Sequence, residues 1–162
     1  MHIRAITDND KPAVRTFFDE AADYVHLETG QAPSDKTVDD FYADHPPQKT
    51  IADTAKFGAF VGDRIFGLLD LGFGYPKDGD VYIAYLVIVS DQRGSGLGVD
   101  LLRHAKKVAA DRGAKNLYLA VLDKNTKGRA FWEREGFQVV LTVPPDPSDQ
   151  MQHFRHRMLL KL

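Results

Sequence analysis

A glycine-rich segment at residues 90–99 constrains the fold of this chain more than any other stretch. Its sequence is Ser-Asp-Gln-Arg-Gly-Ser-Gly-Leu-Gly-Val; an unbroken apolar run, residues 82–89, comes before it and a long amphipathic stretch follows. The pattern predicts a buried strand that turns through three alternate glycines into the start of a helix. Unpaired backbone N–H groups and the positive end of a helix dipole meet at such a turn, so we expect it to bind an anion, typically a phosphate.

Composition limits the kinds of protein that this chain can be. Its 162 residues, 43% of them hydrophobic, predict one globular domain over residues 1–162. A formal charge of −2 argues against a nucleic-acid partner, and the lack of cysteine excludes disulfides, a thiolate zinc site and a Cys nucleophile. Because no apolar run reaches membrane-spanning length and the N-terminus resembles no targeting signal, we expect a cytoplasmic protein with no membrane partner and no metal.

The first half of the chain predicts helices followed by a meander of antiparallel strands. Apolar residues recur at helical spacing from Val14 to Val25, and Gly30 ends that helix. Turn residues separate the later apolar runs, which is typical of hairpins. The predicted elements are a strand over 2–6, helices over 11–29 and 35–44, and strands over 56–61, 65–73 and 81–89.

The second half predicts a crossover and two closing strands. A helix follows the glycine-rich segment and ends at Gly113; the next strand should lie parallel to residues 81–89 because a helix connects them. Asp123 or Asn125 can cap another helix, which Gly136 ends. The predicted elements are helices over 97–112 and 126–135 and strands over 117–122, 137–143 and 154–160. Together, the two halves predict an α/β (α+β) fold.

Two well-known phosphate-binding motifs fit the glycine-rich segment poorly. A Walker A loop needs Lys followed by Ser or Thr after its last glycine, but Val99 and Asp100 stand there. A dinucleotide fingerprint needs a third glycine where this chain has Val99, and it normally opens a parallel fold, whereas a predicted antiparallel meander precedes this turn. A nucleotide-binding module therefore remains only as a weaker alternative.

A third motif fits better. Residues 93–98, Arg-Gly-Ser-Gly-Leu-Gly, match the (Gln/Arg)-x-x-Gly-x-(Gly/Ala) signature of the GNAT N-acetyltransferase superfamily. Residues 125–137, from Asn125 to Gly136-Phe137, resemble the second motif of that family, an Asn-initiated helix that ends in Gly-Phe. The order of predicted elements also agrees with the family, so the chain resembles a GNAT protein over nearly its whole length.

The resemblance implies a mixed, mostly antiparallel central sheet flanked by helices and splayed between the central strand and the next parallel strand. It also implies acetyl-CoA as co-substrate: the glycine turn would hold the pyrophosphate, residues 86–88 would pair with pantetheine, and Asn125 would contact it where the strands separate. The implied cofactor-binding residues are Leu86, Val87, Ile88, Arg93, Gly94, Ser95, Gly96, Leu97, Gly98, Val99 and Asn125.

The catalytic positions of the family are altered in this chain. Many relatives carry a base where this chain has Tyr82 or Ala84, and a tyrosine acid where it has Trp132. Asp70, a lone carboxylate in an apolar strand, is one candidate for the base, and Tyr82 is a second catalytic candidate.

The resemblance implies acetyl transfer to the amine of a small molecule or peptide by direct attack on the thioester. A non-catalytic acyl-CoA sensor is the main alternative, since both catalytic positions differ. We expect residues 24–47 and 144–153 to border the acceptor pocket; the first of these segments carries Tyr24, His26, Glu28, Asp39 and Asp40. Acidic residues in these segments favour a cationic acceptor, and the family makes a homodimer possible.

Overall fold

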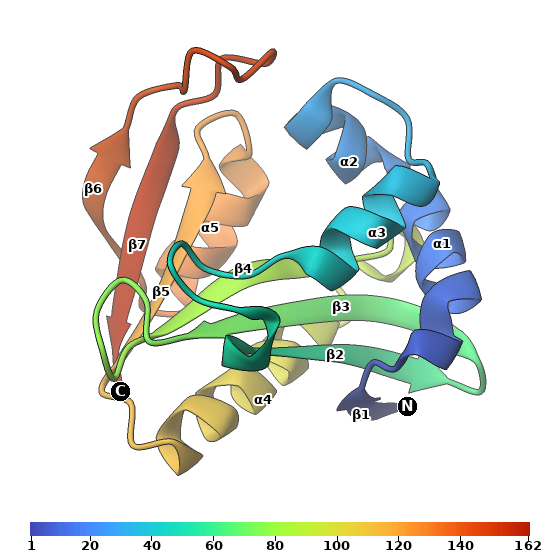
Figure 1. Ribbon diagram of the computed structural model, residues 1–162, viewed down its shortest axis with the longest axis horizontal. Coiled ribbons are helices and arrows are strands. Elements are labelled where there is room, and N and C mark those ends of the chain that lie inside the picture. The colour runs from blue at the N-terminus through green and yellow to red at the C-terminus, as the bar shows by residue number, and fades with distance from the viewer.

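The computed structural model describes residues 1–162, and a seven-stranded sheet with strand order β1-β2-β3-β4-β5-β7-β6 forms its centre (Figure 1). The strands are β1 (His2–Ala5), β2 (Thr54–Val61), β3 (Arg64–Phe73), β4 (Val81–Ile88), β5 (Asn116–Leu122), β6 (Gln138–Val143) and β7 (Arg155–Lys161). The helices are α1 (Lys11–Glu20), α2 (Ala22–Thr29), α3 (Asp35–Ala43), α4 (Leu97–Asp111) and α5 (Thr126–Arg134). The predicted meander, crossover and closing strands are therefore all present.

Helices cover both faces of this sheet. Helices α1 to α3 pack on one face, where Phe17, Phe41 and Phe60 belong to a buried cluster. Helices α4 and α5 pack on the other, where Leu101 and Trp132 belong to a second, larger cluster. Each amphipathic helix buries its apolar stripe against the sheet, which gives the mixed α/β layers that the sequence predicts.

The sheet splays at its single parallel junction. Strands β4 and β5 pair only through Val81–Leu117, Tyr82–Tyr118 and Ile83–Leu119 and then separate, whereas every other neighbouring pair is antiparallel (Figure 1). This confirms the predicted mostly antiparallel sheet and the predicted splay. Beyond Ile83, the edge of β4 that faces β5 has no strand partner.

A bulge in β4 lies where the splay begins. Asp70 of β3 stands opposite Tyr85 and Leu71 stands opposite Ile83, so Ala84 is an extra residue in β4. A bulge bends the strand and turns the following side chains. As a result, Tyr82 and Tyr85, three residues apart, both lie on the face of the sheet that α2 covers: Tyr82 shares a cavity with α2, and the ring of Tyr85 packs on Tyr24.

The predicted continuous helix over residues 11–29 is wrong, because the structure breaks it at Ala21. Ala21 has φ −109° and ψ 24°, and α2 starts in a new direction from Ala22. No glycine or proline marks this position, so the break comes from tertiary contacts. It brings α2 against the glycine turn, where Asp23 pairs with Arg93.

No helix has both the length and the apolar character needed to cross a membrane. No group of three or more His, Cys, Asp or Glu side chains is arranged to hold a metal ion.

Candidate active site

A cavity of about 790 Å³ lies in the splay between β4, the glycine turn and α5. We call it the glycine-turn cavity. Its volume is within the range of small-molecule sites. Nine of the eleven predicted cofactor-binding residues line it: Leu86, Val87, Ile88, Arg93, Gly94, Gly96, Gly98, Val99 and Asn125.

The glycine turn presents unpaired backbone donors to this cavity. Helix α4 begins at Leu97, so the N–H groups of Leu97 and Gly98 have no partner within the helix, and those of Gly94 and Gly96 donate to no backbone carbonyl. Gly94 and Gly96 have φ values of +79° and +92°, which residues with a Cβ rarely adopt. Four free donors at the start of a helix are suited to bind an anion.

The free edge of β4 supplies further backbone groups. The N–H of Val89 donates to the carbonyl of Phe66 at 3.0 Å, on the β3 side of the strand. Because backbone groups alternate along a strand, those of Leu86 and Ile88 point to the opposite side, toward the cavity. The Nε of Arg93 already donates to the carbonyl of Ile88 at 3.1 Å, which leaves Leu86 free to pair with an extended amide-containing ligand.

Four of the eleven predicted cofactor-binding side chains pack or pair within the protein. Ser95 Oγ donates to the carbonyl of Gln92 at 2.6 Å, and Leu97 is buried in the core; neither lines the cavity. The guanidinium of Arg93 pairs with Asp23. Asn125 caps α5, accepting a hydrogen bond from the N–H of Gly128 at 3.0 Å, and also lines the cavity.

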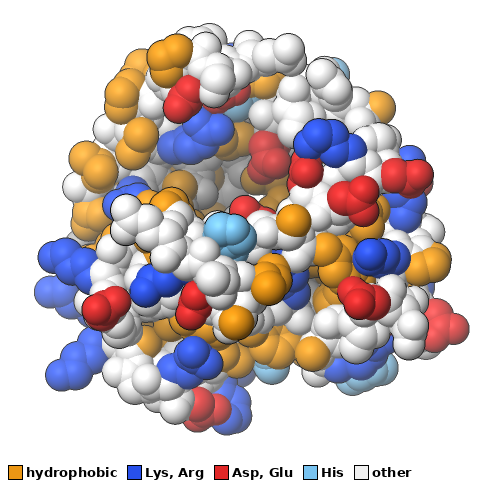
Figure 2. Space-filling view, viewed as in Figure 1, with side chains coloured by type: hydrophobic (Ala, Val, Ile, Leu, Met, Phe, Trp, Pro, Cys, Tyr) orange, Lys and Arg blue, Asp and Glu red, His pale blue; other side chains and the backbone are white.

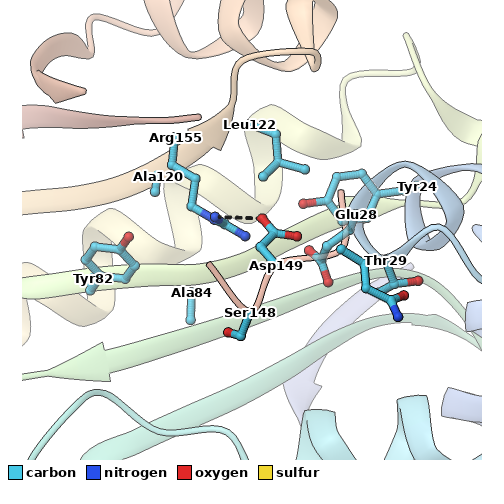
Figure 3. A pocket seen from close by; sticks show the side chains of 11 residues that line it. Tyr24, Glu28, Thr29, Tyr82, Ala84, Ala120, Leu122, Ser148, Asp149 and Arg155 are labelled. Atoms are coloured by element: carbon cyan, nitrogen blue, oxygen red, sulfur yellow. Dashed lines mark hydrogen bonds and ion pairs between the residues drawn. The ribbon is translucent and has the colours of Figure 1, made fainter. Parts of the chain in front are cut away.

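A second cavity, of about 500 Å³, lies between α2, β4, β5 and the β6–β7 loop (Figures 2 and 3). We call it the α2 cavity. Figure 2 shows the surface hollowed here between the helices and the β6–β7 side of the sheet. Its lining residues come from α2, β4, β5, the β6–β7 loop and β7: Tyr24, Glu28, Thr29, Tyr82, Ala84, Ala120, Leu122, Ser148, Asp149, Gln150 and Arg155.

The two cavities adjoin each other. Tyr24 lines both of them, and along β4 the lining passes from Ala84 in the α2 cavity to Leu86 in the glycine-turn cavity. The Tyr24 ring packs edge-on against Tyr85, with 5.7 Å between the ring centroids, and this contact helps to fix it at the junction. A group at the junction is therefore accessible from both cavities.

The acidic side chains of the α2 cavity differ in their partners. Asp149 pairs with Arg155 at 3.3 Å (Figure 3). Burial alone would raise the pKa of Asp149, but hydrogen bonds from the N–H groups of Met151 and His153, together with Arg155, lower it. Glu28 takes part in no ion pair, and burial raises its pKa. Glu28 is thus the acidic side chain of this cavity without an ion-pair partner, although Tyr24 and Arg155 offset part of the effect of burial on its pKa.

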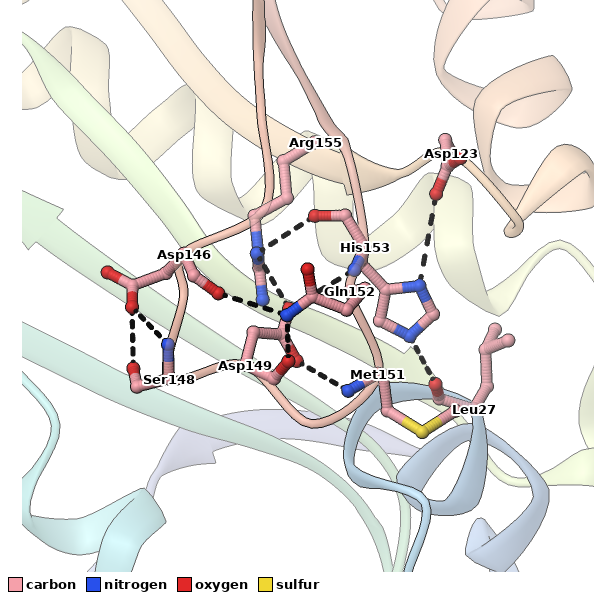
Figure 4. A network of polar contacts seen from close by, with 9 residues as sticks. All are labelled: Leu27, Asp123, Asp146, Ser148, Asp149, Met151, Gln152, His153 and Arg155. Carbon is pink, nitrogen blue, oxygen red and sulfur yellow. Dashed lines mark hydrogen bonds and ion pairs between the residues drawn. The ribbon is translucent and has the colours of Figure 1, made fainter.

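The β6–β7 loop is fastened over one side of this cavity (Figure 4). His153 is fully buried; its Nε2 lies 2.7 Å from the carbonyl oxygen of Leu27 in α2, and its Nδ1 lies 3.8 Å from Asp123 Oδ1. Met151 of the same loop packs against Gly30 at the end of α2. Both segments predicted to border an acceptor pocket therefore meet at the α2 cavity.

Residues 14–137 match the acetyltransferase (GNAT) family. The chain belongs to this GNAT family. An acetyltransferase structure from Thermus thermophilus is similar, with 25% identity, a TM-score of 0.77 and coverage of 99% of this chain and 96% of that one. The ribosomal-protein-S18-alanine N-acetyltransferase of Escherichia coli shares the fold, with 18% identity, a TM-score of 0.69 and coverage of 99% and 92%.

A curated relative, thialysine N-epsilon-acetyltransferase of Bos taurus, is 29% identical over 73 residues. That alignment covers 45% of this chain and 43% of the relative, so this chain spans less than half of the relative's length.

The catalytic candidates of this GNAT chain lie in different surroundings. Tyr82 lines the α2 cavity, and burial raises its pKa to about 12, so its phenol stays protonated at neutral pH. Asp70 lines neither cavity; it lies 2.9 Å from the Nζ of Lys56, and burial raises its pKa to about 7. Trp132, at the usual acid position, packs between Phe131 and Phe137. A catalytic role for Asp70 or Tyr82 stays a prediction.

The sequence pointed to five polar residues of the segment 24–47 as candidates for the acceptor pocket. It did not point to two charged residues from the C-terminal part of the chain that line the α2 cavity. Of the five, Tyr24 and Glu28 line the α2 cavity and His26, Asp39 and Asp40 do not. Asp149 and Arg155 were not predicted individually, although the loop that carries Asp149 was. Helical spacing is the signal that could have paired Tyr24 with Glu28, because residues four apart share a helix face.

Proposed function

We propose that this GNAT protein transfers an acetyl group from acetyl-CoA to an amine. The observation that carries the proposal is the junction of the two cavities at Tyr24 and along β4 from Ala84 to Leu86. A long ligand in one cavity and a small one in the other can meet only there. Transfer of a group between two bound substrates requires such a junction, because the reacting atoms must come into contact.

The glycine-turn cavity is the proposed site of acetyl-CoA. The free N–H groups of Gly94, Gly96, Leu97 and Gly98 would bind its pyrophosphate, and the free edge of β4 at Leu86 would pair with its pantetheine amides. Asn125 would contact pantetheine through its amide group while it caps α5. Lys127 lines the same cavity and would add positive charge near the phosphates.

In the proposed reaction, the neutral amine attacks the thioester carbonyl carbon, a C–N bond forms and the C–S bond breaks. The amine nitrogen loses a proton and the departing thiolate gains one. The N–H of Leu86, which points toward the splay, would stabilise the negative charge that develops on the carbonyl oxygen. The protein otherwise contributes orientation, which by itself can supply much of the rate of such a reaction.

The α2 cavity is the proposed acceptor site. Its volume of about 500 Å³ suits a small molecule or the end of a peptide. The curated relative is named for acetylation of an amine, and the Escherichia coli structure for acetylation of a protein alanine. We propose an amine acceptor for this chain on the same grounds of family.

A cytoplasmic location and a homodimer are also part of the proposal. The edge strand β6 supports the dimer, because Val140 and Leu141 are each 50% exposed on a strand with one free edge. Sedimentation velocity would test the dimer.

Release of free thiol from acetyl-CoA in the presence of a panel of primary amines tests the function. We expect amine-dependent release with at least one small amine. Tight CoA binding without turnover on any amine or on protein extracts would favour the acyl-CoA sensor instead. Thermal stabilisation by ATP or NAD, but not by CoA, would favour a nucleotide-binding module.

A further inference from the structure

Helix α2 places two titratable side chains side by side at the junction of the cavities. Tyr24 and Glu28 are four residues apart, so they share one face of the helix, and both line the α2 cavity (Figure 3). Tyr24 also lines the glycine-turn cavity. No other titratable side chain of this GNAT chain lines both cavities.

Glu28 has the surroundings of an ammonium-binding carboxylate. It has no ion-pair partner, whereas the nearby Asp149 and Arg155 are paired with each other. The charged and titratable groups that face Glu28 are Tyr24 on its own helix, Asp44 after α3, Arg155 on β7 and His153 in the β6–β7 loop. Burial raises the pKa of Glu28, which makes the carboxylate a stronger base than an exposed one.

Tyr24 has the surroundings of a proton donor. Its phenol interacts with the neighbouring Glu28 carboxylate, and its ring packs edge-on against Tyr85. Burial, followed by the neighbouring Glu28 carboxylate, raises the pKa of Tyr24 well above its usual value, so the phenol keeps its proton at neutral pH. A thiolate that leaves at the junction would meet this hydroxyl.

We propose that Tyr24 and Glu28 form the acid–base pair of the acetyl transfer, and that the acceptor is a small primary amine that binds as a cation. The proposal rests on the proposed function. It also fits Ala84 and Trp132, which stand at one of the two base positions and at the acid position of many GNAT relatives, and whose side chains cannot serve in those roles.

The bound ammonium gives one proton to the Glu28 carboxylate, and the neutral amine attacks the thioester carbon. As the C–N bond forms and the C–S bond breaks, Tyr24 protonates the thiolate, and the phenolate recovers a proton from the positively charged amide nitrogen. Glu28 then releases its proton to water. One ammonium and one thioester become one amide, one thiol and one proton.

The lining of the α2 cavity also favours a particular class of amine. Glu28 requires a positive charge, and Thr29, Ser148 and Gln150 offer polar groups to the rest of the molecule. We expect polar amines that are positively charged at neutral pH to be preferred over aromatic amines that are neutral there.

Two conservative variants test the pair, and a third tests rescue by a shorter carboxylate. Glu28→Gln should raise the KM for the amine and lower kcat/KM roughly 10²–10⁴-fold. It should also remove the acidic limb of the kcat/KM pH profile. In the wild type this limb arises because activity rises as Glu28 loses its proton, and its midpoint should lie above the ordinary pKa of a glutamate. Tyr24→Phe should lower kcat with little change in the amine KM. Glu28→Asp should restore part of the activity and the acidic limb.

Matched controls separate these effects from misfolding. Tyr118→Phe and Asp39→Asn make the same chemical changes outside both cavities and should keep wild-type kinetics. Melting temperature and CoA affinity, from titration calorimetry, should match the wild type in all of these proteins. If Glu28→Gln does not fold, amine binding to the wild-type protein with CoA decides: its affinity should rise as Glu28 ionises.

The outcomes are distinct. Folded Glu28→Gln and Tyr24→Phe proteins with turnover within about threefold of the wild type would overturn the pair while leaving the acetyltransferase function intact. Amine binding that is independent of pH across the Glu28 titration would also overturn it. A wild-type protein that acetylates no amine would overturn the proposed function itself.

Discussion

The guanidinium of Arg93, in the glycine turn, pairs with the carboxylate of Asp23, in the first turn of α2, with 2.9 Å between Nη2 and Oδ1. Asp23 directly precedes Tyr24, so the contact joins the proposed CoA-binding turn to the helix that lines the α2 cavity, the proposed acceptor site. The same guanidinium donates through Nε to the carbonyl of Ile88. Arg93 thereby connects three elements of the site before any phosphate is bound.

Asp23→Ala should therefore affect binding of the amine in the α2 cavity more than binding of CoA in the glycine-turn cavity. Loss of this exposed pair should cost at most about 1 kcal/mol of stability. Because α2 loses its connection to the turn, the KM for the amine should rise severalfold, whereas CoA affinity should stay constant or improve as Arg93 becomes free for a phosphate. Calorimetry with CoA and steady-state kinetics measure both. A tenfold loss of CoA affinity with an unchanged amine KM would contradict this account.

Gly96→Val should abolish CoA binding. Gly96 has φ +92°, and a Cβ there would meet no protein atom within 4 Å, so the space that a side chain would fill is the space proposed for the pyrophosphate. Gly113→Val is the matched control, since Gly113 also has a positive φ, +74°, and open space around its Cβ, but lies outside the cavity. Both variants should lose about 1–3 kcal/mol from backbone strain, but only Gly96→Val should lose CoA binding. Equal CoA affinity in the two variants would exclude the assigned site.

Lys56→Met should destabilise the protein by about 3 kcal/mol, because it leaves the Asp70 carboxylate buried without its partner. The pKa of Asp70 is raised to about 7 from an ordinary 3.8, so the folded protein holds this proton more tightly than the unfolded chain. Above pH 7 the buried Asp70 carboxylate is charged and disfavours folding. The free energy of unfolding lost by Lys56→Met should therefore shrink as the pH falls toward 4, where Asp70 is protonated in the folded protein. Urea unfolding at several pH values measures the effect. A loss that grows as the pH falls would contradict it.

Asp70→Asn separates the two proposals for the base. If Asp70 acts as the base, turnover should fall and its pH profile should flatten. Because Asp70 lines neither cavity, we expect turnover within about threefold of the wild type, with the acidic limb of the profile retained. Kinetics across pH decide between Asp70 and Glu28.

His153→Ala should loosen the β6–β7 loop. The change removes the contact of 2.7 Å to the carbonyl of Leu27 and leaves that carbonyl without this partner, at a cost of about 1–3 kcal/mol. The amine KM should rise while CoA affinity stays constant, because the loop borders only the α2 cavity. His104→Ala, which alters a histidine of α4 outside both cavities, is the control. An unchanged amine KM in a destabilised His153→Ala protein would show that the loop does not shape the acceptor site.

Sequence patterns predicted the donor side better than the acceptor side. The glycine turn and the caps at Ser34 and Asn125 are local, so their spacing and chemistry are visible in the chain. The break at Ala21 and the bulge at Ala84 have no local signal, since tertiary contacts impose them. Tyr24 and Tyr82 line the α2 cavity next to these two irregularities, which explains why the sequence could assign segments, but not individual residues, to the proposed acceptor site. Asp70 looked unusual in an apolar strand because its partner, Lys56, lies on the neighbouring strand.

Transfer of an isotope-labelled acetyl group, followed by mass spectrometry of the amine, tests the central claim most directly. The wild-type protein, incubated with labelled acetyl-CoA and a small cationic amine, should give the labelled amide and free CoA in equal amounts, and Gly96→Val should give neither. Hydrolysis of acetyl-CoA to labelled acetate with no labelled amide, or binding of CoA without release of thiol, would contradict the account.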